Sequence, residues 1–534
     1  MPFRATWSDH GIKLGLFVLW LCLVLFMAWH HAFWRDEVRA LSIALHGDSV
    51  VEMLKGLHGE GHPALWYLLL RSAYFVTGNA VVLPVVSIGV ASAAMLLLVL
   101  RSPFSWWMIA LVVLSEFALF EYSVMARNYG ISALLLFLLA ALYTRHRDGG
   151  ILLGVLLALL ANTNAHSVLL VGAFLLFWLI DILCEQGIRW TPAFRTILLN
   201  VAISAAGVVA CLATIYPTYN DAAVKATDGL TLGLLAKALV LPSSSFGGLA
   251  PRLNWEALGF EPQWVIQFRR LQTLLMSLVM FGSLLGLVRS PGALVAGLVS
   301  LLAFSLFFVV IYGGGYRHQA LWLVFLVSLY WIVSATGAKS APRYPRRLQS
   351  LVGPASAVGS GLIVLLVALQ LPKGFRAIAD AALDRPPLSR SSEFAALVSR
   401  RADLQDAIVI ADPDFLLEPL PYYIRNRTYL MREERFGRVT RFTKNARLSL
   451  NLDDILATAG KLRVESGKPI LILLAQRLDP ARPTQLHNEG YNWQLHTTPE
   501  QVRGFLASTQ LIARFAPAKT GPDESFDVYL FDRP

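Results

Sequence analysis

Long apolar runs dominate the first 371 residues of this 534-residue chain. A helix needs about 20 apolar residues to cross the hydrocarbon core of a bilayer, so each long run is a candidate membrane span. The runs are 12–31, 80–100, 104–121, 130–144, 150–162, 167–184, 196–215, 271–288, 292–311, 319–336 and 352–371. Only 15% of residues are charged, against about 25% in soluble proteins. The sequence therefore predicts a polytopic α-helical membrane protein with about 11 transmembrane helices, and it excludes a soluble enzyme.

Basic residues gather on one side of these spans. With a cytoplasmic N-terminus, the connections on the cytoplasmic side carry Arg4, Arg101, Arg145, Arg147, Arg189, Arg195, Arg289, Lys339, Arg343, Arg346 and Arg347. Their acidic residues are only Asp9, Asp148 and Glu185. This is the positive-inside bias that orients membrane proteins, and the pair Arg269 and Arg270 is its one exception.

The same alternation sends three large pieces to the outer side: a loop at 32–79, a loop at 216–270 and the tail after 372. Within the first loop, the apolar stretch 62–78 is interrupted by Arg71 and is predicted to be an interfacial helix. We thus expect two domains, a transmembrane domain at 1–372 and a soluble α/β domain at 373–534.

The tail contains short apolar strand candidates at 407–411, 469–475 and 527–531, which alternate with helical patterns such as 452–462. The net charge of +11 belongs mainly to the membrane part and forms no compact basic face, so no nucleic-acid partner is expected. The three cysteines lie in or beside apolar runs, which argues against a disulfide framework.

Ionisable residues collect at the predicted outer boundary of the membrane, where they are costly and usually mark a functional or a paired structural site. They come from five separate connections: Asp36 and Glu37 in FWRDEVRAL, His62 in GEGHPALWYLLL, Glu121 and Arg127 in FEYSVMARNYG, His166 in ANTNAHS, and Arg317 and His318 in YGGGYRHQA. Glu116 lies within a predicted span. Random loop polarity would scatter such residues over both faces of the membrane.

Each of these residues also has a structural interpretation. His62 precedes Pro63, which suits the first position of a helix. Arg127 can extend its side chain to the interface, and the three glycines before Tyr316 can simply turn the chain. The spacing His58-x-Glu60-x-His62 allows a divalent metal, but a loop spacing without further ligands leaves metal binding open.

In their order along the chain, these motifs resemble those of the GT-C superfamily of polyprenyl-phosphate-sugar-dependent membrane glycosyltransferases. The resemblance covers about residues 10–340: a first span, W-x-D-E in the first outer loop, H-P-x-L-W-Y-L-L-L, Y-S-x-x-A-R-N-Y, a His-bearing turn and an R-H turn. The subgroups most alike are the protein-mannosyltransferase-like and the aminoarabinose- or galacturonate-transferase-like bacterial families. The tail matches only in position and class.

The resemblance implies roles for individual residues. Asp36 takes the place of the catalytic carboxylate, with Glu37 beside it, and His62 matches the His-Pro start of the next helix. Tyr122, Arg127 and Tyr129 match the aromatic-and-arginine turn, and Glu121 adjoins it as a further substrate-binding candidate. A second acidic motif has no clear counterpart, and its candidates without a pattern are Asp221, Asp228, Glu256 and Glu261.

The chemistry of glycosyl transfer suits the roles that the resemblance implies for these residues. Glycosyl transfer needs a base near the acceptor hydroxyl, for which Asp36 is the candidate. It also needs cations on the departing phosphate, for which Arg127 and Arg317 are candidates, assisted by His166 or His318. We expect transfer of a sugar, with inversion, from a polyprenyl-phosphate donor to a lipid, glycan or protein acceptor at the periplasmic face of a bacterial inner membrane. The alternatives are a transporter or flippase, and a glycan-binding assembly protein without catalysis.

Overall fold

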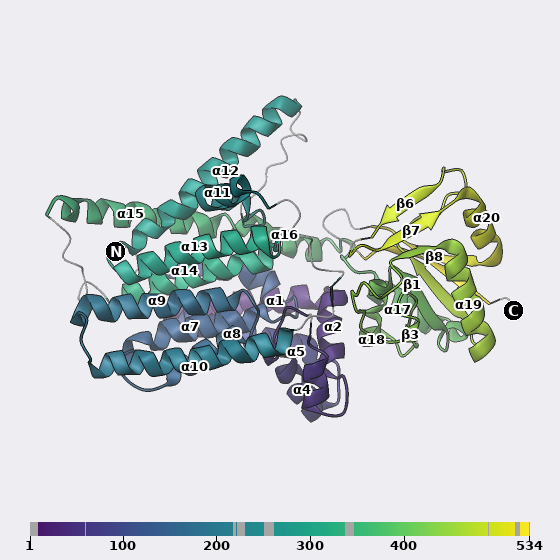
Figure 1. Ribbon diagram of the computed structural model, residues 1–534, viewed down its shortest axis with the longest axis horizontal. Coiled ribbons are helices and arrows are strands. Elements are labelled where there is room, and N and C mark those ends of the chain that lie inside the picture. The colour runs from purple at the N-terminus through teal and green to yellow at the C-terminus, as the bar shows by residue number, and fades with distance from the viewer. Residues whose placement is uncertain are drawn as a thin grey trace.

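The structure is a computed structural model that describes residues 9–58, 60–216, 220–221, 230–249, 261–336, 346–489, 491–517 and 524–532. A bundle of long helices forms the larger part of the molecule, and a smaller strand-containing domain lies at one end of the bundle (Figure 1). The long helices are α1 (Asp9–Trp29), α5 (Val82–Arg101), α7 (Tyr129–His146), α9 (Ser167–Gln186), α10 (Pro192–Ile215), α12 (Pro262–Leu284), α13 (Pro291–Val310), α14 (Tyr316–Thr336) and α15 (Arg346–Ala368).

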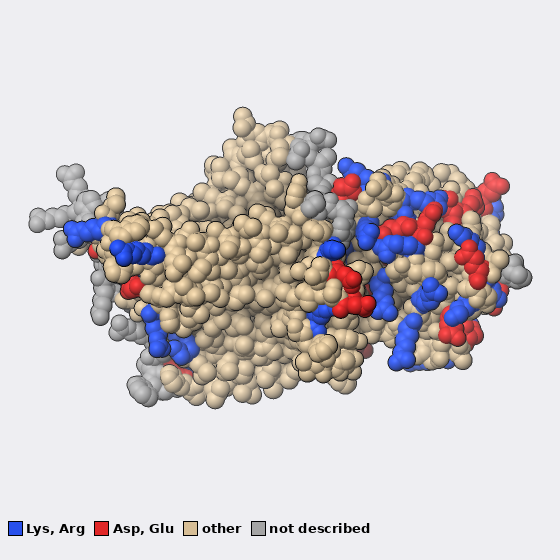
Figure 2. All heavy atoms as spheres, turned by 60° about the horizontal axis from the view of Figure 1, so that its bottom comes forward, with Lys and Arg blue, Asp and Glu red and all other residues tan. Residues whose placement is uncertain are grey.

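Within the described part of the chain, nine helices are long and apolar enough to cross a membrane. On the face drawn in Figure 2, the flank of the bundle shows no Lys, Arg, Asp or Glu, and charged side chains gather at its two ends. This is the surface expected of a protein whose helices are surrounded by lipid. The prediction of a polytopic helical membrane protein is confirmed. Of the basic residues expected on the cytoplasmic side, Arg4, Lys339 and Arg343 and the side chains of Arg346 and Arg347 lie outside the described part.

Two of the eleven predicted spans are shorter than a membrane crossing, so the number eleven is not confirmed. The run 104–121 is divided into α6 (Trp106–Val113) and a π-helical turn, η1 (Phe117–Glu121). The run 150–162 forms the ten-residue helix α8 (Leu152–Ala161). The break before η1 has a packing partner: α15 is followed by α16 (Leu371–Ala382), whose Gly374 passes so close that a Cβ there would lie 2.5 Å from the carbonyl oxygen of Leu114.

The first outer loop is itself helical. It contains α2 (Arg35–Ala44), α3 (Val50–Lys55) and α4 (Leu65–Thr77), and α4 corresponds to the predicted interfacial helix. Arg71, which interrupts the apolar pattern of α4, donates hydrogen bonds to the carbonyl oxygens of Ala44 and Gly47 at 2.9 and 3.0 Å. This arginine therefore ties α4 to the end of α2.

The C-terminal domain has a mixed four-stranded sheet in the order β1-β5-β9-β8. Its strands are β1 (Ile408–Asp412), β5 (Ile470–Leu474), β8 (Gln510–Phe515) and β9 (Phe526–Phe531). β1 and β5 run parallel, β9 is antiparallel to both its neighbours, and helices such as α17 (Ser391–Arg400) and α19 (Leu452–Ser466) accompany the sheet. The sequence pattern placed β1, β5, β9 and α19 correctly, because continuous apolar runs are typical of strands buried on both faces.

A second, three-stranded sheet has the order β4-β7-β6, formed by β4 (Ser449–Asn451), β7 (Gln494–Thr497) and β6 (Gln485–Asn488). The domain reaches the bundle through α18 (Leu420–Tyr423) and the turn η6 (Asp414–Leu417), which both contact α2. Helix α2 thus lies at the junction of the bundle and the C-terminal domain, as Figure 1 shows.

Candidate functional site

Asp36 lies in the first turn of α2 and faces two arginines from distant parts of the chain. Its Oδ2 atom is 2.8 Å from Nη1 of Arg127, which precedes α7, and 3.7 Å from Nη2 of Arg317 in the first turn of α14. The Asp36 side chain is 28% exposed, whereas those of Arg127 and Arg317 are 9% and 16% exposed. The structure therefore combines an accessible carboxylate with two shielded cations at the end of the bundle.

Glu37 is adjacent to Asp36 in sequence but points to another side of α2. Its side chain is fully buried, and Oε1 accepts a 2.7 Å hydrogen bond from the backbone N–H of Ala126. Oε2 accepts a 3.1 Å bond from the N–H of Trp34 and pairs with Nε2 of His31 at 2.9 Å. Glu37 thereby fixes the start of α2 against the loop that carries Arg127.

His62 lies on the far side of Arg127 from Asp36. Arg127 donates from Nη2 to Nε2 of His62 at 2.8 Å, so the planar guanidinium joins His62 to Asp36. A nitrogen that accepts a hydrogen bond carries no proton, and this requires a neutral His62 imidazole in the structure. The side-chain amide of Asn128 lies 3.2 Å from the other ring nitrogen of His62, which carries the imidazole proton in this tautomer.

A row of rings continues from His62 into the bundle. The ring of Tyr129 lies 6.0 Å from that of His62 and 5.3 Å from that of His318, and His318 lies 4.9 Å from His166. The hydroxyl of Tyr129 and both ring nitrogens of His166 are buried and have no hydrogen-bond partner among the described residues. Buried polar atoms in native proteins are nearly always paired with protein, ordered water or a ligand, so these atoms are available to a water molecule or to a polar group of a ligand.

Tyr122 supports the second arginine, and Glu121 lies within the electrostatic influence of that arginine. The Tyr122 hydroxyl donates a 2.7 Å hydrogen bond to the carbonyl oxygen of Arg317, and its ring stacks on that of Tyr129 at 5.9 Å. Glu121 ends the turn η1, and its Oε2 atom is buried without a hydrogen-bond partner among the described residues. Tyr122 therefore has the contacts of a residue that holds the start of α14 in place.

The electrostatics of the site follow from burial and from the arginines. Burial by itself would raise the pKa of Asp36, but the surrounding guanidinium groups, with Arg127 foremost, hold that pKa below its ordinary value. Burial lowers the pKa of His62 well below the ordinary value, and the charge of Arg127 lowers it further. Burial lowers the pKa of His166 to about 4. Near neutral pH the site therefore contains an ionised Asp36 and neutral histidines.

Metal ligation finds no support in the part of the chain that the structure describes. No group of three or more His, Cys, Asp or Glu side chains there is arranged to hold a metal ion. Glu60, the central residue of the His58-x-Glu60-x-His62 pattern, is instead bound by the guanidinium of Arg39. Asp221, one of the second acidic candidates, accepts a hydrogen bond from the N–H of Lys444. Asp228 and Glu256 lie outside the described residues, and Glu261 precedes α12.

Two residues of α2 that the motif analysis did not select join the site to the C-terminal domain. Arg39 binds Glu60 of the outer loop and also Glu418, and it donates a 2.9 Å hydrogen bond to the carbonyl oxygen of Thr440. The backbone N–H of Arg35 donates to Glu524 at 3.0 Å. The sequence signal was the i,i+4 pair of arginines around the acidic dipeptide, R-D-E-V-R, but the partners of these arginines lie in the tail.

No protein-family model matches this chain, and neither does any curated protein. Two solved structures are similar to it over 97% of each chain: ArnT from Cupriavidus metallidurans bound to undecaprenyl phosphate, and the same protein in the apo state. The first has 13% sequence identity and a TM-score of 0.46, and the second has 14% and 0.44. At this distance the roles of individual residues follow from the contacts within this chain alone.

Proposed function

We propose that this protein transfers a sugar from a polyprenyl-phosphate donor to an acceptor hydroxyl at the outer face of a bacterial inner membrane. The observation that carries the proposal is the position of Asp36, an accessible carboxylate within 4 Å of two shielded arginines at one end of an apolar bundle. A base beside two cations is the set of groups that displacement of a phosphate by a hydroxyl requires.

The proposed reaction is a single displacement. The acceptor oxygen forms a bond to the anomeric carbon while the bond from that carbon to the phosphate oxygen breaks, and the electron pair leaves with the phosphate. Arg127 and Arg317 stabilise the departing phosphate through charge-assisted hydrogen bonds. Asp36 takes the hydroxyl proton, and because one displacement reverses the anomeric centre, the product has inverted configuration.

The ion pairs of Asp36 explain how a carboxylate of low pKa can act as a base. Without a donor, Arg127 and Arg317 direct their charge at Asp36 and make it a weak proton acceptor. A bound phosphate shares these cations, which raises the proton affinity of Asp36. The base is thus strengthened only when the donor is in place.

The ring row supplies the sugar-facing groups. His62, Tyr129, His166 and His318 present aromatic faces, and the unpaired atoms of Tyr129 and His166 suit hydroxyl groups. Glu37 is a positioning residue in this proposal, because its carboxylate oxygens are occupied by backbone N–H groups and His31. Tyr122 supports Arg317 through its hydrogen bond to the backbone of that residue, and the charge of Glu121 acts on the same arginine.

The test uses purified full-length protein, a panel of polyprenyl-phosphate sugars and an envelope-lipid acceptor pool, with polyprenyl phosphate release followed by mass spectrometry. Release by the wild type should fall at least about 100-fold in Asp36→Asn, since loss of a general base costs about 10²–10⁴ in rate. Asp48→Asn, in the same outer loop but exposed, is the matched control and should keep full activity. Undiminished release by Asp36→Asn, or no release by folded wild-type protein with any donor, would refute the proposal.

A further inference from the structure

Asp36 presents its two carboxylate oxygens to different cations. Oδ2 faces Arg127 and Arg317, which belong to the helical bundle. Oδ1 faces the preceding residue, Arg35, whose Nε atom is 3.8 Å away. Burial raises the pKa of Asp36, and among the charges that lower it below its ordinary value, Arg35 ranks after Arg127 and before Arg317. The reaction proposed above gives this third arginine no role.

The C-terminal domain holds the side chain of Arg35 in place. The guanidinium lies over the Phe415 ring, with 4.2 Å between its carbon atom and the ring centroid, and Nη2 donates to the Tyr491 hydroxyl at 3.4 Å. The backbone N–H of Arg35 donates to Glu524 at 3.0 Å. These three partners come from separate segments of the tail, so the position of the guanidinium depends on the folded C-terminal domain.

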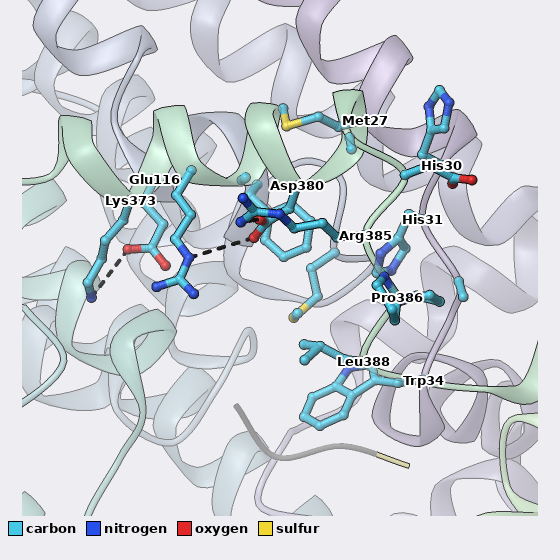
Figure 3. A pocket seen from close by; sticks show the side chains of 18 residues that line it. Met27, His30, His31, Trp34, Glu116, Lys373, Asp380, Arg385, Pro386 and Leu388 are labelled. Atoms are coloured by element: carbon cyan, nitrogen blue, oxygen red, sulfur yellow. Dashed lines mark hydrogen bonds and ion pairs between the residues drawn. The ribbon is translucent and has the colours of Figure 1, made fainter. Parts of the chain in front are cut away.

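Arg35 and Arg317 reach Asp36 from different directions. Arg317 lies over the Trp34 ring, with 4.9 Å between the guanidinium carbon and the ring centroid. Trp34 borders a pocket of about 680 Å³ beside α16, and Figure 3 shows it at one end of that pocket. Arg35, the next residue, is not among the described residues that line the pocket. A group that binds the bundle arginines therefore leaves the contacts of Arg35 in place.

Glu524 holds Arg35 without taking much of its charge near neutral pH. The Glu524 side chain is buried, and its Oε1 atom is 3.9 Å from Nε of Arg35. Burial raises the pKa of Glu524 to about 8, although a hydrogen bond with Ser389 and the charge of Arg35 lower it. Below that pH Glu524 is mostly protonated, so the charge of Arg35 remains directed at Asp36.

The other charged groups around this pair are bound to one another. Arg39, the fourth arginine that acts on Asp36, is bound by Glu60 and Glu418. Glu418 is also the second carboxylate of the tail that acts on Arg35, and it is engaged by Arg39. The pairing of Arg35 with Asp36 is therefore not shared with an unbound carboxylate among these groups.

We propose that Arg35 is a positioning residue, held by the C-terminal domain, that keeps Asp36 ionised after the donor phosphate has taken Arg127 and Arg317. This proposal rests on the proposed function and gives the C-terminal domain a part in catalysis. The phosphate shares the bundle arginines and so raises the proton affinity of Asp36, while Arg35 still faces Oδ1 and limits the rise. The limit matters because a carboxylate that is protonated before the acceptor arrives cannot accept the hydroxyl proton.

The test follows the ionisation of Asp36 without turnover. A carbodiimide modifies carboxyl groups in their protonated form, so its rate of reaction with Asp36 at a series of pH values, read by peptide mass spectrometry, gives the pH midpoint of that carboxyl. The full-length protein is saturated with undecaprenyl phosphate, the probe for the departing phosphate. Arg35→Gln should raise the midpoint by about 1–3 pH units, because a neighbouring guanidinium lowers the pKa of a carboxyl by about that amount.

Two further variants separate charge from structure. Arg35→Lys keeps the positive charge and should return the midpoint toward that of the wild type, although it loses the planar contact with Phe415. Arg503→Gln, at an exposed position of the C-terminal domain, is the control and should leave the midpoint unchanged. Equal thermal unfolding of the four proteins establishes that the variants are folded. An unchanged midpoint in Arg35→Gln, or the same shift in Arg35→Gln and Arg35→Lys, would overturn the proposal.

Binding of undecaprenyl phosphate distinguishes a positioning residue from a phosphate ligand. Arg35→Gln should bind the probe as tightly as the wild type does, whereas Arg127→Gln should bind it at least about 10-fold more weakly, since charge-assisted hydrogen bonds to phosphate are strong. Weakened binding in Arg35→Gln to the extent seen in Arg127→Gln would make Arg35 a donor ligand and overturn its assigned role.

Turnover supplies the last readout. In the release assay at saturating donor and envelope-lipid pool, the acid limb of the kcat profile reports ionisation in the substrate complex. This limb should move to higher pH in Arg35→Gln and stay in place in Arg503→Gln, and an unmoved limb in Arg35→Gln would contradict the proposal. Failure of all donors in the wild type would refute the proposed function, while the carbodiimide midpoints would still decide whether Arg35 controls Asp36.

Discussion

Arg127 is the residue on which the contacts of the site converge. One guanidinium nitrogen contacts Asp36 and another contacts His62, at 2.8 Å in each case. A planar, doubly branched cation can hold two partners at fixed angles, and an ammonium group cannot do so from a single nitrogen at the end of a flexible chain. The geometry therefore requires arginine at this position, whereas a need for positive charge alone would accept lysine.

Arg127→Lys should thus lower kcat/KM for the donor at least about 10-fold although the charge is kept, because only one of the two contacts can be restored. The measurement is polyprenyl phosphate release at varied donor concentration. Arg101→Lys, at an exposed position near the other end of the bundle, should behave as wild type. Equal kcat/KM for Arg127→Lys and wild type would show that charge alone is needed.

His166 links the site to the pH dependence of stability. Burial lowers its pKa to about 4, below the value of about 6.5 expected in the unfolded chain, so the folded state favours the neutral form. The contribution of this shift to the free energy of unfolding is complete above pH 6.5. It is lost as the pH falls toward 4, because the unfolded chain then binds a proton that the native protein does not bind. A pKa shift of this size corresponds to a loss of about 3 kcal/mol in the free energy of unfolding once the pH has fallen to the native pKa.

His166→Phe should therefore make the unfolding temperature less dependent on pH between 6.5 and 4 than it is in the wild type. The side chain already packs among the rings of Phe304, Phe307 and Phe308, so a phenyl ring is accommodated. Thermal unfolding in detergent at a series of pH values measures this. His496→Phe, at an exposed position, is the control, and an unaltered pH slope in His166→Phe would contradict the assigned burial effect.

At the scale of elements, α2 gives the acidic dipeptide two separate functions. Successive residues of a helix point about 100° apart, so Asp36 faces the arginines while Glu37 faces the loop before α7. Glu37 also accepts a hydrogen bond from the N–H of Trp34 at the helix start, an orphan donor that a Glu at the third helical position commonly satisfies. One short helix therefore carries the proposed base and the group that aligns it.

Glu37→Gln should lower stability by about 1–3 kcal/mol, because an amide has one acceptor oxygen where the carboxylate serves N–H groups with both. Activity should fall while the pH optimum of the remaining activity stays in place, since Glu37 does not take the proton. Thermal unfolding and the pH–rate profile measure the two effects. A displaced pH profile would instead assign Glu37 to proton transfer.

At the scale of the whole molecule, the C-terminal domain completes the surroundings of α2. Arg39 binds Glu418 of that domain and Glu60 of the outer loop, and Tyr423 accepts a 2.7 Å hydrogen bond from the N–H of Phe33. Arg35 lies over the ring of Phe415 at 4.2 Å. The tail is thus tied to the helix that carries Asp36 and lies on the same side of the membrane.

Labelling of single cysteines tests this arrangement. In a variant whose three native cysteines are alanine, Arg503→Cys in the C-terminal domain should react with a membrane-impermeant maleimide in intact cells with a permeabilised outer membrane. Arg189→Cys, at the opposite end of the bundle, should react only after the inner membrane is opened. Both positions are exposed, so accessibility differs only through the membrane. The reverse pattern would invert the proposed topology.

The sequence by itself determined the class of fold, most of the spans, the core strands of the tail and Asp36 as a site candidate. These depend on local properties: the length of an apolar run against the thickness of a bilayer, the side on which basic residues collect, and the cost of charge at a membrane boundary. Such properties depend on residues that are consecutive in the sequence, so they can be recognised before any tertiary contact is known.

Only the tertiary structure decided which partners, and therefore which role, each candidate residue has. Adjacent residues such as Asp36 and Glu37 differ in their partners, and the partners that distinguish them, Arg127, Ala126 and Arg317, lie about 90 positions away or more. The break in the run 104–121, the contacts of Arg39 with the tail and the pocket beside Trp34 likewise arise where distant segments pack together. Hydropathy along the chain cannot encode these features, because they depend on which helix faces come together once the bundle has formed.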